Sequence, residues 1–215
     1  MTSSLVKICG LSTPESLDAA LDAGADMVGF VFFPPSPRNI GLETARALGA
    51  RVAGRALKVS LTVDATDEVF AALVEALRPD ILQLHGKETP ERLLDLRAKF
   101  GLPVMKAIGV ATAADLAAVG RYEPVADRLL FDARPPKDAT RPGGNGNAFD
   151  WNLLAGVKTA RPWMLSGGLD PDNVAEAVRM TRAPGVDVSS GVESAPGVKD
   201  LAKIAAFVAR ARAAV

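Results

Sequence analysis

Apolar, β-branched segments alternate along the chain with Ala- and Leu-rich segments in which apolar residues recur at helical spacing. The apolar segments predict strands at residues 5–9, 27–32, 56–63, 80–85, 103–109, 128–132, 162–166 and 185–189. The segments that follow predict helices at residues 14–23, 42–51, 66–77, 90–100, 112–121, 151–156, 171–181 and 199–213. Three of these helices have a proline in the first turn behind a polar N-cap candidate, at Thr13-Pro14, Thr89-Pro90 and Asp170-Pro171.

Strand–helix units of about 25 residues, with no Gly/Ser-rich linker between them, are typical of parallel βαβ structure. Eight such units is the number in a (β/α)8 barrel. We therefore expect residues 1–215 to form a single α/β domain with the TIM-barrel fold. The alternative is a doubly wound open sheet, which would need a topological switch point, and none is visible in the sequence.

Two of the predicted βα loops are longer than the fold requires. The loop at residues 33–41 holds three prolines, and the loop at residues 133–150 holds Pro135-Pro136 and Gly143-Gly144-Asn145-Gly146. Long loops can be tolerated insertions. In a barrel, however, the βα loops build the active-site face, so two long loops there favour a functional site.

Composition narrows the class of protein. The 25 Lys and Arg residues balance 25 Asp and Glu residues, so no positive excess is present to neutralise the phosphates of a nucleic acid. Hydrophobic residues make up 48% of the chain, which argues against disorder, yet no apolar run approaches the roughly 18 residues of a membrane span. The N-terminus also lacks the pattern of a signal peptide. We therefore expect a cytoplasmic protein whose partner is neither a nucleic acid nor a membrane.

One cysteine and one histidine limit the covalent and metal chemistry of the chain. A lone cysteine forms no internal disulfide, which fits a reducing cytoplasm. With so few soft ligands, we expect no metal site. No Gly-rich loop of the nucleoside-triphosphate type is present either.

Two residues at predicted strand ends are candidates for acid–base chemistry. Cys9 ends the first strand, and Lys7 shares its face, so a neighbouring ammonium would favour the thiolate. Asp132 ends the sixth strand, where it could act as a general acid or base. The alternatives are a small buried thiol for Cys9 and an N-cap or a partner of Lys106 for Asp132. Strands one and six lie nearly opposite in an eight-stranded ring, so the two groups could flank one substrate.

Glycines and serines follow the last two predicted strands, in Ser166-Gly167-Gly168-Leu169 and Ser189-Ser190-Gly191. Glycine lets backbone N–H groups approach an anion closely, and these two loops form the recurrent phosphate site of the barrel. Each loop alone is a weak signal. Together they predict a phosphorylated small molecule bound at Gly167, Gly168, Ser189, Ser190 and Gly191.

Three further side chains are candidates for substrate contact. Arg38 lies in the proline-rich loop, and its guanidinium suits a planar carboxylate, although a solvated surface arginine is the alternative. His85 ends the fourth strand and either contacts the substrate or is a hydrogen-bonded structural group. Asp187, in the eighth strand, either serves as a ligand or pairs with Lys7, because a barrel closes strand eight onto strand one.

In this combination the chain resembles the phosphoribosylanthranilate isomerase family, from the first strand to the last helix. The segments that carry the resemblance are Lys7-Ile8-Cys9-Gly10, Gly29-Phe30-Val31-Phe32-Phe33 with Ser36-Pro37-Arg38, Gln83-Leu84-His85-Gly86, Phe131-Asp132, Gly143-Gly144-Asn145-Gly146 with Phe149-Asp150-Trp151, Ser166-Gly167-Gly168-Leu169 with Asn173, and Asp187-Val188-Ser189-Ser190-Gly191-Val192-Glu193 with Lys199-Asp200. The chain departs from the family's pattern at Asn145, where a threonine is usual, and at residues 60–64, where a Gly-Val-Phe-Val-type run is common. Neither departure touches Cys9 or Asp132.

The resemblance implies an isomerase of tryptophan biosynthesis. In that family the cysteine ending strand one is the general base and the aspartate ending strand six is the general acid, and these roles fall on Cys9 and Asp132. The family's arginine for the anthranilate carboxylate falls on Arg38. The implied reaction is the Amadori rearrangement of N-(5-phosphoribosyl)anthranilate to 1-(2-carboxyphenylamino)-1-deoxyribulose 5-phosphate, which requires no cofactor or metal. We expect a monomer or a weak homodimer.

Three other functions remain as alternatives. The aminoaldose isomerase of the histidine pathway uses an aspartate where Cys9 stands. An indole-glycerol-phosphate synthase depends on an early catalytic lysine and on glutamates whose setting is not recognisable here. A non-catalytic phosphate-binding protein would keep the glycine loops but would need no opposed thiol and carboxyl group.

Overall fold

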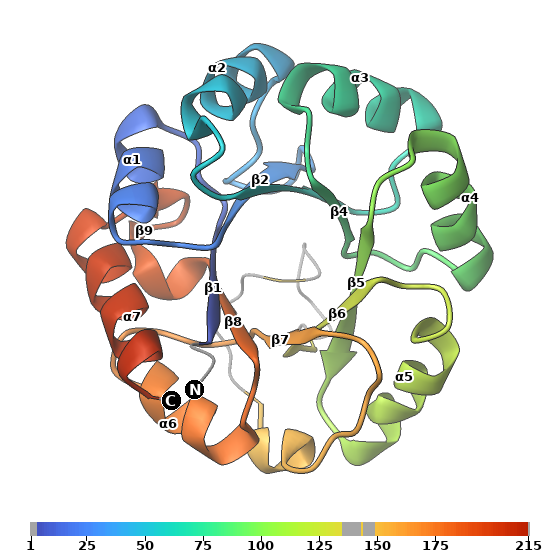
Figure 1. Ribbon diagram of the computed structural model, residues 1–215, viewed down its shortest axis with the longest axis vertical. Helices are drawn as coiled ribbons and strands as arrows, with labels where there is room; N and C mark the ends of the chain where they lie inside the picture. The colour runs from blue at the N-terminus through green and yellow to red at the C-terminus, as the bar shows by residue number, and fades with distance from the viewer. Residues whose placement is uncertain (1–3, 135–142, 144–148, 215) are drawn as a thin grey trace.

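The computed structural model describes residues 4–134, 143 and 149–214, which form a closed barrel of parallel strands inside a ring of helices (Figure 1). The strands are β1 (Leu5–Cys9), β2 (Met27–Phe32), β3 (Leu57–Thr62), β4 (Ile81–Leu84), β5 (Val104–Val110), β6 (Arg128–Ala133), β7 (Trp163–Leu165) and β8 (Gly185–Val188). Each strand pairs with the next, and β8 closes the barrel by pairing with β1. The predicted TIM barrel is therefore confirmed, and the open-sheet alternative is wrong.

Helical segments follow the strands and cover the outside of the barrel (Figure 1). The α-helices are α1 (Pro14–Asp22), α2 (Leu42–Val52), α3 (Asp67–Leu77), α4 (Pro90–Phe100), α5 (Ala117–Tyr122), α6 (Val174–Thr181) and α7 (Leu201–Ala213). Short 3₁₀ turns are η1 (Ala113–Leu116), η2 (Trp151–Leu154) and η3 (Ser190–Val192). The helix predicted at residues 112–121 is thus a 3₁₀ turn joined to a short α-helix. The helix predicted at residues 151–156 is a 3₁₀ turn alone.

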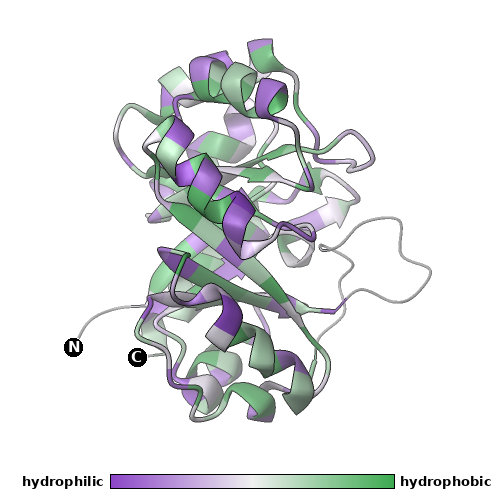
Figure 2. Cartoon of the chain, turned by 90° about the vertical axis from the view of Figure 1, so that its right-hand side faces the viewer, coloured by the Kyte–Doolittle hydropathy of each residue, from purple (hydrophilic) through white to green (hydrophobic). Residues whose placement is uncertain are grey.

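Two apolar layers hold this arrangement together. The barrel interior is filled by a cluster of buried side chains that includes Met27, Val59, Met105, Leu130 and Met164. A larger cluster lies between the outer faces of the strands and the inner faces of the helices. Because a parallel barrel buries both faces of its strands, these strands read as continuous apolar runs, and Figure 2 shows them mostly in the hydrophobic colour while the helices carry both colours.

The first two predicted helix caps are confirmed, whereas the third precedes a turn and not the helix itself. Thr13 and Thr89 each accept a backbone N–H with the side chain, and Pro14 and Pro90 open α1 and α4. The helix start predicted at residue 171 is wrong, although Asp170 Oδ1 accepts the backbone N–H groups of Asp172 and Asn173, at 2.7 and 3.0 Å. This forms a turn, and α6 begins only after Asn173.

A short hairpin after β8 was not predicted. It consists of β9 (Glu193–Ala195) and β10 (Val198–Lys199), which pair in antiparallel fashion. The helix expected at residues 199–213 therefore starts at Leu201, where Asp200 accepts the N–H groups of Ala202 and Lys203. We call residues 193–199 the β9–β10 hairpin.

The carboxyl ends of the strands bring the candidate residues to one face of the barrel. Asp132 is the second-last residue of β6. His85, Ser166 and Ser189, which were predicted to end their strands, each lie one residue beyond the observed ends of β4, β7 and β8. Each remains at the mouth, because parallel strands all end on the same side. Within the described ranges, no helix is long and apolar enough to cross a membrane.

Candidate active site

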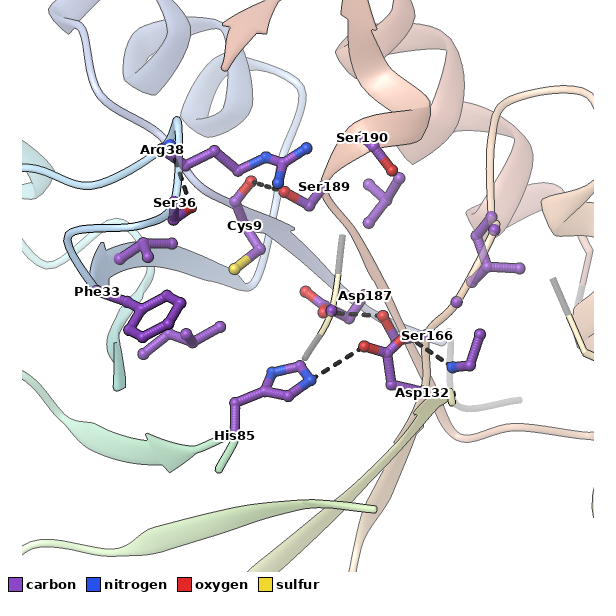
Figure 3. A pocket seen from close by; sticks show the side chains of 18 of the residues that line it. Cys9, Phe33, Ser36, Arg38, His85, Asp132, Ser166, Asp187, Ser189 and Ser190 are labelled. Atoms are coloured by element: carbon purple, nitrogen blue, oxygen red, sulfur yellow. Dashed lines mark hydrogen bonds and ion pairs between the residues drawn. The ribbon is translucent and has the colours of Figure 1, made fainter. Parts of the chain in front are cut away.

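A cleft opens at the carboxyl ends of the strands, with a volume of about 780 Å³ including its open mouth. The candidate residues that line it are Cys9, Arg38, His85, Asp132, Gly167, Gly168, Asp187, Ser189 and Ser190. Figure 3 shows the Cys9 sulfur and the Asp132 carboxylate projecting toward this cleft from β1 and β6. The structure therefore brings together residues as far apart in the sequence as Cys9 and Ser190.

Cys9 is held by its neighbours on both sides. Its side chain is buried, and its backbone carbonyl accepts a 3.1 Å hydrogen bond from Ser189 Oγ. On β2, a Cβ atom at Gly29 would lie 2.8 Å from the Cys9 sulfur, closer than real atoms approach. Gly29 thus leaves the space that the sulfur occupies.

Lys7 and Asp187 form an ion pair in the barrel interior. Lys7 Nζ lies 2.8 Å from Asp187 Oδ1, and the two side chains are 0% and 6% exposed. Asp187 Oδ2 also accepts a 3.2 Å hydrogen bond from Ser166 Oγ. Although burial opposes it, the charge of Asp187 raises the pKa of Lys7 to about 12. The predicted pairing of Asp187 with Lys7 is confirmed.

Lys7 favours the thiolate of Cys9, as expected, because its charge lowers the pKa of the thiol, but this effect is outweighed. Burial raises the pKa of the Cys9 thiol more than the charge of Lys7 lowers it. The negative charge of Asp187 raises the pKa of the thiol further, because it repels a thiolate. Lys199 contributes a second, smaller lowering effect. The sequence showed the cation but not the burial or the anion that outweigh it.

Asp132 is oriented by two hydrogen bonds. Its Oδ2 lies 3.0 Å from His85 Nε2, and its Oδ1 accepts the backbone N–H of Ala133 at 2.9 Å. On the far side of the ring, His85 Nδ1 lies 3.4 Å from the amide nitrogen of Gln83. Both ring nitrogens of His85 thus have a partner, and the tautomer of the ring decides which of them donates. His85 is therefore a hydrogen-bonded group that also faces the cleft.

Lys106 is not the partner of Asp132. Its Nζ lies 2.9 Å from Glu88 Oε2 in a second buried pair and donates to the Gly86 carbonyl at 2.7 Å. Glu88 also accepts the backbone N–H groups of Asp64 and Gly86. This network fixes the loop that follows His85.

Arg38 is not a solvated surface residue, because only 3% of it is exposed. Its Nε and one terminal nitrogen donate to the two carboxylate oxygens of Glu193, at 2.7 and 2.8 Å. Such a bidentate pair fixes the plane of the guanidinium. Arg38 also lines the cleft.

The glycine loops have backbone shapes that favour glycine. Gly167 and Gly168 have φ angles of +86° and +67°, in the left-handed region. A Cβ at Gly167 would also lie 2.5 Å from the backbone nitrogen of Ala133. Asn173 donates to the Gly168 carbonyl at 2.9 Å, so the turn ahead of α6 holds this loop.

Gly191 differs from the other candidates because it does not line the cleft. A side chain at this position would collide with the Leu169 carbonyl in the loop after β7. Gly191 therefore permits close contact between the two loops that carry the phosphate prediction.

Sequence reasoning missed four residues that shape this site. Gln83 contacts the ring of His85, and Gly29 makes room for the Cys9 sulfur. Glu193 holds Arg38, and Lys199 holds the loop after β8. All four lie in motifs of the sequence, but the contacts of Gly29 with Cys9 and of Glu193 with Arg38 join residues that are distant in the chain. Of the Gly143-Gly144-Asn145-Gly146 motif, only Gly143 is described, and the rest lies outside the described residues.

Gly143 lies close to the Asp132–His85 pair. A Cβ added to it would stand 2.6 Å from Asp132 Oδ2 and 2.8 Å from His85 Nε2.

In the described part of the chain, no group of three or more His, Cys, Asp or Glu side chains could hold a metal ion.

Comparison with known proteins gives one consistent match. Residues 6–210 match the family described as “N-(5'phosphoribosyl)anthranilate (PRA) isomerase”. The N-(5'-phosphoribosyl)anthranilate isomerase of Bradyrhizobium sp. (strain ORS 278) is 68% identical over 210 residues, which cover 98% of this chain and 96% of that protein. The enzyme of the same name from Nitrobacter winogradskyi is 67% identical over 210 residues, covering 98% and 93%.

Solved structures agree with this match. The phosphoribosyl anthranilate isomerase of Thermotoga maritima superposes with a TM-score of 0.88 at 35% identity, covering 98% of this chain and 99% of that one. A phosphoribosyl anthranilate isomerase in complex with reduced 1-(o-carboxyphenylamino)-1-deoxyribulose 5-phosphate superposes with a TM-score of 0.83 at 32% identity, with the same coverage.

Proposed function

The chain belongs to the N-(5'-phosphoribosyl)anthranilate isomerase family, and from this membership we propose how it converts N-(5'-phosphoribosyl)anthranilate to its 1-deoxyribulose 5-phosphate isomer in tryptophan biosynthesis. We propose that Cys9 is the general base and Asp132 the general acid. The observation that supports these roles most directly is that a thiol from β1 and a carboxyl group from β6 face one cleft. An acid and a base on different sides suit a reaction that protonates one atom and deprotonates another.

The reaction then proceeds in three steps. Protonated Asp132 donates to the ring oxygen of the ribose, the bond from C1 to that oxygen breaks, and the nitrogen lone pair forms a Schiff base at C1. The Cys9 thiolate removes the proton at C2, and its electron pair moves to give an enolamine. Ketonisation adds a proton at C1 and removes one from the C2 hydroxyl, so the enzyme ends with the number of protons it had at the start.

The two ends of the substrate are bound by separate groups in this proposal. Backbone N–H groups in the loops at Gly167-Gly168 and Ser189-Ser190 hold the phosphate, and Gly191 allows these loops to meet. Arg38 binds the anthranilate carboxylate. His85 contacts the substrate and keeps Asp132 in position, and Asp187 contacts it from the wall of the cleft.

The environment of Cys9 favours a strongly basic thiolate over one that is abundant at neutral pH. Since burial raises the pKa of the thiol, less thiolate is present at neutral pH, but each thiolate is a stronger base toward a carbon-bound proton. Substrate binding excludes water and leaves Lys7 and Lys199 as the cations whose charge lowers the pKa of this sulfur.

Fluorescence turnover of the purified protein tests the proposal, because substrate and product both carry the anthranilate fluorophore in different bonding. Conversion of N-(5'-phosphoribosyl)anthranilate is expected without any added metal or cofactor. The aminoaldose substrate of the histidine pathway serves as the control and is expected to be converted far more slowly. Binding of the anthranilate compound without turnover would favour a non-catalytic phosphate-binding protein.

A further inference from the structure

Beside the cleft lies a buried cluster of three charges, of which Glu193 has no part in the proposed mechanism. Glu193 pairs with Arg38 on one side and with Lys199 on the other, the Lys199 Nζ to Oε1 distance being 2.8 Å. The side chains of Arg38, Glu193 and Lys199 are 4%, 5% and 1% exposed. Ion pairs on the surface contribute little to stability, whereas a buried charge is strongly destabilising when its partner is removed.

The β9–β10 hairpin, which supplies both Glu193 and Lys199, packs against the loop that carries Arg38. Gly197 at its tip has a φ of +82°, and a Cβ there would lie 2.6 Å from the carbonyl oxygen of Pro37. The Gly197 N–H donates to Glu193 Oε2 at 3.1 Å. The hairpin thus holds its own glutamate and touches the backbone next to Arg38.

Lys199 extends the same cluster toward the predicted phosphate site. Its Nζ donates to the Ser189 carbonyl at 2.8 Å, and Ser189 Oγ donates in turn to the Cys9 carbonyl. Glu193 and Lys199 therefore join the arginine on one side of the cleft to the loop after β8.

Charge makes Glu193 the central member of the cluster. Burial lowers the pKa of Lys199, and Glu193 opposes this lowering. Burial also acts to raise the pKa of Glu193, but hydrogen bonds and charge from Arg38 and Lys199 hold it below its usual value. Without the carboxylate, two buried cations would face each other, and Arg38 would lose the partner that fixes its plane.

We propose that Glu193 is a positioning residue that sets the affinity of this enzyme for its carboxylate-bearing substrate by holding Arg38, and that Lys199 joins this arginine to the phosphate loop. The proposal rests on the proposed function, in which Arg38 binds the anthranilate carboxylate. Glu193 itself does not line the cleft. Its effect on the reaction must therefore pass through Arg38.

A double-mutant cycle with two probes tests the proposal. Steady-state kinetics with N-(5'-phosphoribosyl)anthranilate gives kcat and KM, and inhibition by ribose 5-phosphate reports the phosphate end alone. Glu193→Gln is expected to raise KM at least about tenfold while kcat changes less than about threefold, because the variant weakens substrate binding and leaves the chemical step in place. The Ki of ribose 5-phosphate is expected to stay within about twofold for this variant and to rise for Lys199→Met.

The cycle separates positioning from general damage to the fold. In an Arg38→Ala background, Glu193→Gln is expected to change KM by less than about twofold, because two residues that act as one unit are not additive. Glu193→Asp, which keeps the charge, is expected to recover part of the lost affinity and serves if the glutamine variant folds poorly. Lys203→Met is the matched control, since Lys203 is an exposed residue of α7 whose Nζ donates to the backbone carbonyl of Glu193.

Two results would overturn different parts of the argument. If Glu193→Gln raises KM equally in the parent and Arg38→Ala backgrounds, or lowers kcat with KM unchanged, Glu193 does not act through Arg38. If Arg38→Ala itself retains the parental KM, the substrate carboxylate is bound elsewhere. The role of Arg38 in the proposed function is then wrong, whatever the effect of Glu193→Gln.

Discussion

The buried Lys7–Asp187 pair allows a quantitative prediction about stability. Asp187→Asn keeps the shape of the side chain but removes its charge, which leaves the ammonium of a fully buried lysine without a counter-ion. Removing one partner of a buried pair typically costs about 3–5 kcal/mol. With the usual unfolding entropy of about 2.1 cal/mol/K per residue, this corresponds to a decrease in Tm of about 7–11 °C for a chain of this length.

The measurement is denaturant and thermal unfolding of four proteins. Asp22→Asn is the control, because its pair with Arg55 is exposed and is expected to contribute less than about 1 kcal/mol. The double variant Lys7→Met, Asp187→Leu replaces both charges with apolar groups and is expected to recover most of the stability lost by Asp187→Asn. A loss no larger than that of Asp22→Asn would refute the claim that the interior pair holds an otherwise costly charge.

Three further predictions concern the cleft. In steady-state kinetics, Arg38→Ala is expected to lower kcat/KM, with a loss of transition-state stabilisation of about 2–5 kcal/mol, and Arg38→Lys is expected to recover only part of this loss. Full activity of the alanine variant would show that the substrate carboxylate is bound elsewhere. Gly168→Asp puts a carboxylate at the proposed phosphate loop and is expected to raise both KM and the Ki of ribose 5-phosphate, so an unchanged Ki would contradict the phosphate site. Because burial raises the pKa of Cys9, thiolate forms only as pH rises past the usual value of about 8.5, and iodoacetamide labelling of the free enzyme is expected to have its midpoint above that value rather than below it.

The barrel could be predicted because its signal is local and repeated. Each strand is an apolar run that ends before a helix with its own cap, as at Thr13-Pro14 and Thr89-Pro90. Cys9 and Asp132 could be proposed for the same reason, since a polar residue at the end of an apolar strand points to the mouth of a barrel. The helix start at residue 171 was wrong because Asp170 forms its two side-chain hydrogen bonds with a turn that precedes α6.

The contacts of the site depend on information that is not local. Arg38 and Glu193 are 155 positions apart, so nothing near either residue indicates the pair. The β9–β10 hairpin has only three residues in one strand and two in the other, too few for an alternating pattern to stand out. The direction of the Cys9 pKa depends on the balance of burial, Lys7 and Asp187, which only their packing in three dimensions decides.

The most direct test of the proposed acid–base pair is the turnover number of Cys9→Ser and Asp132→Asn, measured by anthranilate fluorescence alongside binding of a reduced product analogue. The serine hydroxyl is too weak an acid to supply an anionic base near neutral pH, and the asparagine amide carries no transferable proton. Each variant is expected to fold by circular dichroism, to bind the analogue nearly as the parent does, and to lose at least about 10²-fold in kcat. A folded Cys9→Ser protein that turns over at close to the parental rate would contradict the assignment of Cys9 as the base and would leave its thiol as a small buried side chain.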